Sequence, residues 1–177
     1  MIFVVLNGPP GSGKTTIGRE LARALSGRYK TITDSFAAPM KHFIAVALGE
    51  KYGEFPKDSP RDILRGTSVR EFLIHLSEHY MKPLYGEDIY GRLFYHRALR
   101  NSPPPDFVIA DDGGFQHELD ALDGKHFLVH VRRPGTDFKN DSRSYLPDQH
   151  WTFNNDVAID ELWIRTRPLV QELEKLL

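Results

Sequence analysis

Short apolar runs along the chain predict the strands of a buried sheet. Ile2 to Leu6, Phe107 to Ala110 and Phe127 to Val131 are each bounded by polar or turn-forming residues. Continuous runs of this length are typical of parallel strands that are covered on both faces. Tyr29 to Thr33 is a weaker fourth candidate, and Trp151 to Phe153 is a short fifth.

Apolar residues at helical spacing predict amphipathic helices between these strands. The positions that carry the pattern are Ile17, Leu21, Leu25, Val69, Phe72, Leu73 and Leu76. A last helix is predicted from about Ile159 to the end, and Pro168 is expected to kink it or to begin a second piece. Alternating strands and helices predict an α/β fold with a mostly parallel sheet.

The length and the element pattern predict a single domain with an insertion. A chain of 177 residues fits one domain. The helical stretch from Ser35 to Arg100 is too long for a simple crossover, so residues 35–100 are expected to form a substrate-side insert, and residues 1–34 and 101–177 the core. Gly53 to Pro60 is a predicted turn within that insert.

Composition and charge narrow the class of protein. The net charge of -1 provides no general attraction for nucleic acid or for an anionic membrane. The chain has no cysteine, which excludes disulfides, thiolate catalysis and zinc sites built on cysteine. No apolar stretch approaches the ~20 residues that a membrane helix needs. We therefore expect no nucleic-acid or membrane partner. The expected location is the cytoplasm, or the host cytoplasm if the protein is viral. A homodimer is left open.

The segment after the first predicted strand is a phosphate-binding loop. Gly8 to Thr15 satisfies G-x-x-x-x-G-K-[ST], and an amphipathic helix follows it. In such loops backbone N–H groups and the helix N-terminus bind the nucleotide phosphates. Lys14 is expected to contact the β- and γ-phosphates of ATP, and the hydroxyl of Thr15 to bind Mg²⁺. The residues predicted to bind ATP are Gly8, Gly11, Ser12, Gly13, Lys14, Thr15 and Thr16.

A second apolar run ends in two carboxylates. Asp111 and Asp112 follow Phe107 to Ala110 directly. Ligands of open α/β sheets bind beyond the carboxyl ends of the strands, and in P-loop enzymes an aspartate there meets Mg²⁺. One of the two is predicted to serve the metal and the other to form a turn with Gly113 and Gly114, and which does which is left open.

Arginines follow the predicted strand Phe127 to Val131. Arg132, Arg133 and Arg143 lie in a polar loop with glycine and proline, and residues 132–147 are predicted to form a lid over ATP. Their charge would stabilise the phosphoryl group in transfer.

The predicted acceptor residues begin where the predicted strand Tyr29 to Thr33 ends. Asp34 and Phe36 lie at that end, and Lys41 follows them. Arg61 and Arg65 are expected to share a helix face, with Arg70 offset from it; the predicted acceptor-binding residues are Asp34, Phe36, Lys41, Arg61, Arg65 and Arg70.

The order of these segments resembles the bacteriophage-type deoxynucleoside monophosphate kinases, within the wider nucleoside monophosphate kinase superfamily. After the phosphate loop come D-S-F-A-A-P-M-K (34–41), R-x-x-L-R-G-T-S-V-R-E (61–71), G-E-D-I-Y (86–90) and V-I-A-D-D-G-G-F-Q-H-E (108–118). The resemblance implies a P-loop kinase three-layer sandwich with five strands, a helical insert that binds the nucleoside monophosphate, and an arginine-bearing lid. It also implies transfer of the γ-phosphoryl group of ATP to a deoxynucleoside monophosphate.

The resemblance also assigns individual residues. Phe36 and Lys41 would line the acceptor nucleotide, and Arg70 would hold its phosphate. Asp112 would match the aspartate of the family's D-x-R-F-x-x-E segment, whose last position falls on Glu118. The chain departs from the family at Gly114, where the family has arginine, and the lid arginines are candidates to replace it.

Three functions remain open at this point. The leading prediction is an ATP-dependent kinase for a deoxynucleoside monophosphate, with Lys14, Arg132, Arg133 and Arg143 as catalytic residues. A nucleoside or small-metabolite kinase of the same fold is the alternative, and Asp34 could then serve the acceptor hydroxyl. A non-enzymatic NTP-binding module is the third.

Overall fold

The computed structural model of the protein describes residues 1–51, 56, 58–139 and 141–177. The chain divides into two compact units. One comprises Met1–Phe36 together with Gly91–Leu177, and the other comprises Ala37–Tyr90. Half of the predicted turn at Gly53 to Pro60, and Asn140 in the predicted lid, lie outside the described residues.

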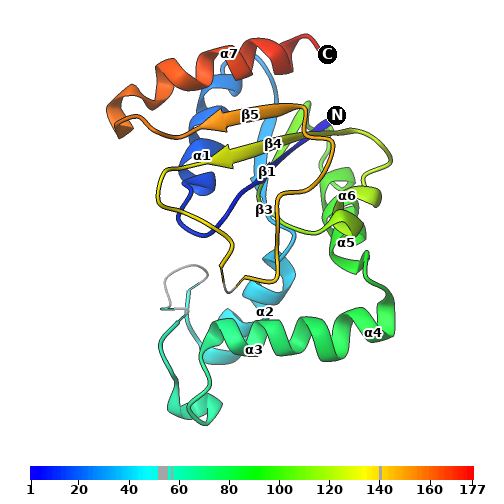
Figure 1. Cartoon of the computed structure of the whole chain (residues 1–177). Helices are drawn as coiled ribbons and strands as arrows, with labels where there is room; N and C mark the ends of the chain where they lie inside the picture. Colours follow the sequence, from blue (N-terminus) through cyan, green and yellow to red (C-terminus); the bar gives the residue numbers. More distant parts are fainter. Residues whose placement is uncertain (52–55, 57, 140) are drawn as a thin grey trace. The chain divides into compact units, whose positions relative to one another are not determined.

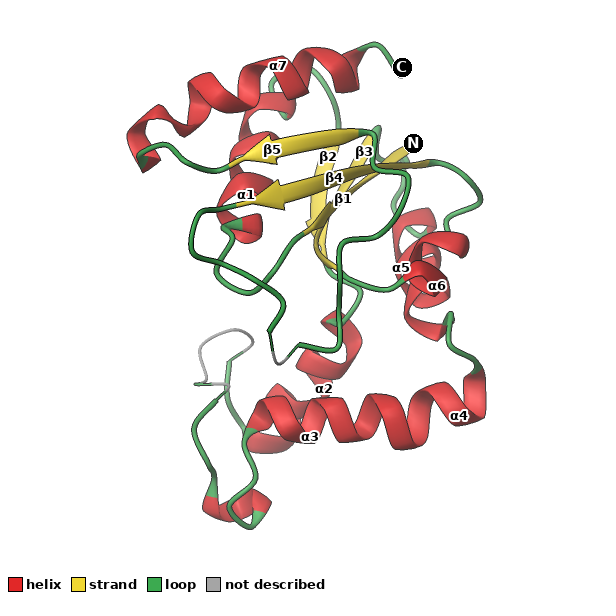
Figure 2. Cartoon of the chain, viewed as in Figure 1, coloured by secondary structure: helices red, strands yellow, loops and turns green. Residues whose placement is uncertain are grey.

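Five parallel strands form one sheet in the larger unit, in the order β2-β3-β1-β4-β5 (Figure 2). The strands are β1 (Ile2–Asn7), β2 (Thr31–Asp34), β3 (Phe107–Gly113), β4 (His126–Arg132) and β5 (Trp151–Asn154). The predicted five-stranded α/β fold is therefore confirmed. β1 is the central strand, and Phe3 to Leu6 are fully buried. Burial on both faces explains why this segment is apolar at every position.

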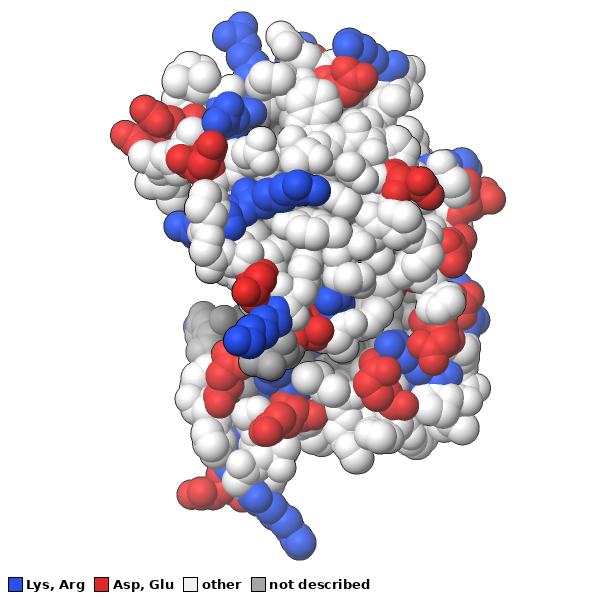
Figure 3. All heavy atoms as spheres, viewed as in Figure 1, with Lys and Arg blue, Asp and Glu red and all other residues white. Residues whose placement is uncertain are grey.

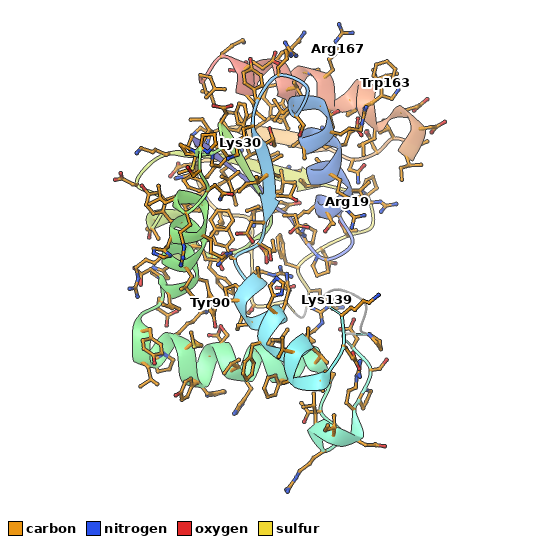
Figure 4. All side chains as sticks on the ribbon, turned by 180° about the vertical axis from the view of Figure 1, so that it is seen from behind. Arg19, Lys30, Tyr90, Lys139, Trp163 and Arg167 are labelled. Carbon is orange, nitrogen blue, oxygen red and sulfur yellow. The ribbon has the colours of Figure 1, made fainter. Side chains whose placement is uncertain are left out.

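One face of the sheet is covered by α1 (Lys14–Leu25) and α7 (Leu162–Glu174) (Figure 1). The predicted stripe of Ile17, Leu21 and Leu25 is completely buried. A 3₁₀ turn at Ile159–Glu161 leads into α7. On α7, Trp163 and Arg167 project away from the sheet (Figure 4).

α7 settles one of the two alternatives predicted for Pro168. The helix runs through this residue, so no second piece begins there. A proline inside a helix removes one hydrogen bond and costs roughly 3 kcal/mol. Leu162 before the proline and Leu169 and Leu173 after it are all buried in the same core. Packing on both sides of Pro168 therefore offsets the lost hydrogen bond.

The other face of the sheet is covered by α5 (Ile89–Leu99) and α6 (Gln116–Asp120) (Figure 1). The ring centroid of Phe3 lies 5.6 Å from those of both Phe94 and Tyr95 on α5. Phe3 precedes Val4, which faces α1, and successive strand residues point to opposite faces. The larger unit is thus a three-layer sandwich.

The smaller unit is helical. It contains α2 (Ala38–Leu48), a 3₁₀ turn (Asp62–Leu64), α3 (Val69–Leu76), a π-helical segment (Ser77–Met81) and α4 (Lys82–Tyr85). Ile44, Ala45 and Val69 form its buried centre. α3 begins at a capping box, in which Ser68 N–H donates to Glu71 Oε2 at 2.8 Å and Glu71 N–H donates to Ser68 Oγ at 3.2 Å.

Within the described residues, none of the helices has both the length and the hydropathy required to span a membrane.

Candidate active site

The phosphate loop connects the end of β1 to the start of α1. Gly11 and Gly13 have φ angles of +77° and +95°, which side-chain-bearing residues rarely adopt. α1 has no side-chain cap at its N-terminus and no acidic residue in its first turn, where Thr15 and Thr16 are exposed. The free N–H groups and the helix dipole therefore suit an anion such as the phosphates of ATP.

Lys14 lies over this loop. Its Nζ donates to the carbonyl oxygens of Gly8 at 2.7 Å and Pro9 at 2.9 Å. Burial, followed by the positive charge of Arg143, lowers the pKa of Lys14 to about 8, and the nearby Asp111, Asp141 and Asp112 oppose that shift. The phosphate loop, the end of β3 and the predicted lid thus share one electrostatic environment.

The two aspartates at the end of β3 differ in their surroundings. Oδ1 of Asp112 accepts a hydrogen bond from the N–H of Phe36 at 2.8 Å, so Asp112 holds the end of β2. Asp111 lies on the α1 side of the sheet, where a Cβ on Gly18 would be 3.7 Å from that of Asp111. Hard oxygen donors such as the Asp111 carboxylate and the Thr15 hydroxyl fit Mg²⁺. These two residues are the better candidates to hold it.

The segment after β4 is a loop that carries the three predicted arginines. Arg132 is exposed, with its guanidinium 5.3 Å from the ring centroid of Tyr145. Arg133 is also exposed, and its Nη1 donates to the carbonyl of Gly11 at 3.2 Å. Arg143 is more buried and forms a bidentate ion pair with Asp141, with N···O distances of 2.8 and 2.7 Å. The arginines therefore occupy three different environments.

Two asparagines that sequence reasoning missed hold this site together. Asn7 is fully buried, and its Nδ2 donates to the carbonyls of Gly113 at 3.1 Å and Ser144 at 3.0 Å. Its Oδ1 accepts from the N–H of Leu146 at 3.1 Å. Asn155 follows β5, and its Nδ2 donates to the carbonyl of Ser12 at 2.8 Å. Neither belongs to a predicted motif, and the signal in the sequence is no more than an amide side chain at the end of a strand.

At the end of β2, the predicted acceptor residues Asp34 and Phe36 have different positions. Asp34 accepts from Ser35 N–H at 2.7 Å and from Arg97 Nε at 2.9 Å, which fixes the orientation of its carboxylate. Phe36 is only 1% exposed, and its ring centroid lies 4.5 Å from that of Phe94. The Phe36 ring therefore packs in the core of this structure, and its expected role in lining the acceptor site stays a prediction.

The remaining predicted acceptor residues lie in the helical unit. Lys41 is on α2 and is partly exposed. Arg61 pairs with Glu50, and Arg70 pairs with Asp58. Arg61 and Arg65 do not share a helix face, because only Asp62–Leu64 between them is helical and Arg65 has a positive φ of 53°.

Charge is mixed over the visible surface. Figure 3 shows Lys and Arg interspersed with Asp and Glu on this face. At the phosphate loop itself, Lys14 and Arg133 donate hydrogen bonds to backbone carbonyls, and Arg143 acts on Lys14 through its charge.

Comparison with known proteins establishes the fold. No family model and no curated protein sequence matches the chain. Among solved structures, the Mycobacterium tuberculosis APS kinase in complex with AMPPNP and APS is 14% identical with a TM-score of 0.54, over 96% of this chain and 97% of that one. The shikimate kinase of Aquifex aeolicus is 14% identical with a TM-score of 0.51, over 98% of this chain and 97% of that one.

A sugar kinase from Janibacter is also similar, with 14% identity and a TM-score of 0.51 over 97% of this chain and 95% of that one. At this identity the likeness shows the fold alone. The chain therefore has the fold of the small P-loop kinases over nearly its whole length. The narrower resemblance to bacteriophage-type deoxynucleoside monophosphate kinases stays a prediction.

Proposed function

We propose that the protein is an ATP-dependent phosphotransferase that acts on a small molecule. The observation that carries this proposal is the set of groups around the phosphate loop. The uncapped N-terminus of α1, Lys14, Asp111 and Arg143 all belong to the carboxyl edge of one parallel sheet. This edge is where ligands of open α/β folds bind.

The reaction requires little covalent chemistry from the protein. The bond between the acceptor oxygen and the γ-phosphorus forms while the bond from that phosphorus to the β-γ bridging oxygen breaks, and ADP leaves. Lys14 and Arg143 would stabilise the charge on the transferring group. Thr15 and Asp111 would hold Mg²⁺, which supplies further positive charge at the phosphates when bound.

A hydroxyl-bearing metabolite is the first candidate acceptor. Asp34 ends β2 with a carboxylate that two donors hold in place, and it can accept the proton of an acceptor hydroxyl. The three similar solved structures are named as kinases of APS, shikimate and sugar, and that fold likeness is compatible with such an acceptor.

A deoxynucleoside monophosphate is the second candidate, and the ordered motifs from residue 34 to residue 118 support it. Two observations favour it less. Arg61 and Arg70, which would bind the acceptor phosphate, are paired with Glu50 and Asp58. Phe36, which would contact the sugar, is buried in the core.

A screen of acceptors tests the proposal and separates the candidates. ADP release would be followed with ATP and Mg²⁺ against a panel of polyols, sugars, hydroxy acids, nucleosides, ribonucleoside monophosphates and deoxynucleoside monophosphates. ³¹P NMR of the product distinguishes a phosphate monoester from a diphosphate. Within active monophosphates, kcat/KM for dGMP against GMP and for dAMP against AMP measures the preference for deoxyribose. ATP binding without turnover of any acceptor would instead support a non-enzymatic NTP-binding module.

Lys14→Met tests the phosphate loop itself. We expect kcat to fall by at least about 10²-fold, as when one preorganised donor to a transition-state charge is lost. Arg19→Met is the matched control, because Arg19 is an exposed basic residue on α1 (Figure 4). Unchanged kcat in Lys14→Met, or an equal loss in Arg19→Met, would contradict the assignment of Lys14.

A further inference from the structure

Gly114 lies next to β3, and its missing side chain leaves room for Arg143. A Cβ on Gly114 would overlap Cδ of Arg143 and would lie 2.7 Å from its Cγ and 3.3 Å from its Cβ. These are the three heavy atoms nearest to such a Cβ, so the space belongs to Arg143. Gly114 is not among the residues with positive φ, and its backbone could therefore carry a side chain.

The guanidinium of Arg143 is fixed by Asp141. Nε donates to Oδ1 at 2.8 Å and Nη2 donates to Oδ2 at 2.7 Å, while the backbone N–H of Arg143 donates to the same Oδ1 at 2.9 Å. The side chains of Arg143 and Asp141 are only 21% and 13% exposed. A bidentate pair this shielded from water fixes both the direction and the plane of the guanidinium.

Arg143 also acts on the phosphate loop. Its charge is the second cause, after burial, of the lowered pKa of Lys14, and it lies within electrostatic reach of Asp112 and Glu118. Arg132 and Arg133 are exposed and lack a carboxylate partner in the described part of the chain. Of the three arginines, Arg143 is therefore the one with a defined position beside Lys14.

We propose that Gly114 and Asp141 are positioning residues for Arg143. Gly114 leaves open the space for the aliphatic part of Arg143, and Asp141 holds the guanidinium where it meets the transferring phosphoryl group. The proposal rests on the proposed phosphotransferase function, in which Arg143 contacts the reacting phosphate.

Gly114→Ala is the direct test, because the added methyl group displaces Arg143 without straining the backbone. The assay is turnover of ATP with water as the acceptor, so it does not require the natural acceptor. We expect kcat to fall at least about tenfold while KM for ATP changes less than about threefold, as for loss of a contact made in the transition state. Gly27→Ala is the matched control, because a Cβ on Gly27 meets nothing within 4 Å.

A double-mutant comparison shows whether the effect acts through Arg143. In an Arg143→Ala background, adding Gly114→Ala should change kcat by less than about twofold. Asp141→Asn should lower kcat several-fold in the wild-type chain and leave kcat unchanged in the Arg143→Ala background. If circular dichroism shows that Gly114→Ala does not fold, Asp141→Asn alone tests whether Arg143 must be positioned. Equal losses in both backgrounds, or a higher kcat in Asp141→Asn, would overturn the proposal. If the wild-type protein turns over ATP but Gly114→Ala and Asp141→Asn match it, only this inference fails. If the wild type turns over ATP neither with water nor with any acceptor of the panel, the proposed function fails with it.

Discussion

Asn155 offers a test of how the phosphate loop is held in its binding conformation. Its Nδ2 donates to the carbonyl of Ser12 at 2.8 Å, and its backbone N–H donates to the carbonyl of Arg132 at 2.7 Å. A Cβ on Gly13 would overlap Nδ2 of Asn155. Asn155 therefore packs directly on the loop and links it to the end of β4.

Removal of this side chain has a calculable effect. A hydrogen bond between neutral groups contributes roughly 0.5–1.5 kcal/mol, and 1 kcal/mol corresponds to about a fivefold change in Kd. Asn155→Ala should therefore raise the Kd for ATP by about fivefold. Asn155→Asp keeps the size of the side chain but sets a carboxylate against the Ser12 carbonyl and near the phosphates. The carbonyl then faces a carboxylate instead of a donor, which costs roughly 1–3 kcal/mol, so we expect Kd to rise by about 5-fold to about 160-fold.

Calorimetric titration with a non-hydrolysable ATP analogue measures both variants. Asn154→Ala is the matched control, because Asn154 is the neighbouring residue and its side chain is exposed. We expect the Kd for the analogue to be lowest in the wild type and in Asn154→Ala, higher in Asn155→Ala and highest in Asn155→Asp. Wild-type affinity in Asn155→Asp would refute the assignment of Asn155 as a support of the loop.

Two further predictions concern Phe36 and His130. Phe36→Ala should lower the free energy of unfolding, measured by urea titration, by about 3–5 kcal/mol, because the ring is buried against Phe94. Unchanged stability together with a changed preference for deoxyribose would instead place the ring at the acceptor site. Burial lowers the pKa of His130 below its usual value of 6.5, so the unfolded chain binds the proton at a higher pH than the folded one. The free energy of unfolding should therefore fall as the pH drops below about 6.5, and less steeply in His130→Asn, which cannot titrate; identical pH dependence in the two proteins would contradict the shift.

The elements that the sequence predicted well are those with a local signal. The phosphate loop is contiguous from Gly8 to Thr15, and the buried stripe of α1 repeats every four residues. The strands of the sheet are short apolar runs because both of its faces are covered. Sequence reasoning could therefore give the fold class and locate the candidate phosphate loop, whose role in ATP binding stays a prediction.

The features that it missed depend on residues far apart in the chain. The residues around Phe36 in the sequence do not show whether its ring faces a cleft or packs in the core. Its packing partner Phe94 lies 58 positions further along the chain. Asn7 and Asn155 act on partners more than a hundred positions away. Arg61 and Arg65 have helical spacing, but the helix between them is only three residues long.

The central position of β1 has a consequence for how the protein is made. β1 pairs with β3 through Ile2 and Phe107, and with β4 through Phe3 and His126. β1 therefore leaves the ribosome about a hundred residues before either neighbour exists. At roughly 5–20 residues per second, this segment stays unpaired for about 5–20 s. During that interval Ile2 to Leu6 is an exposed apolar strand, so we expect the nascent chain to need chaperone protection and to bind nucleotide only after synthesis has passed β4.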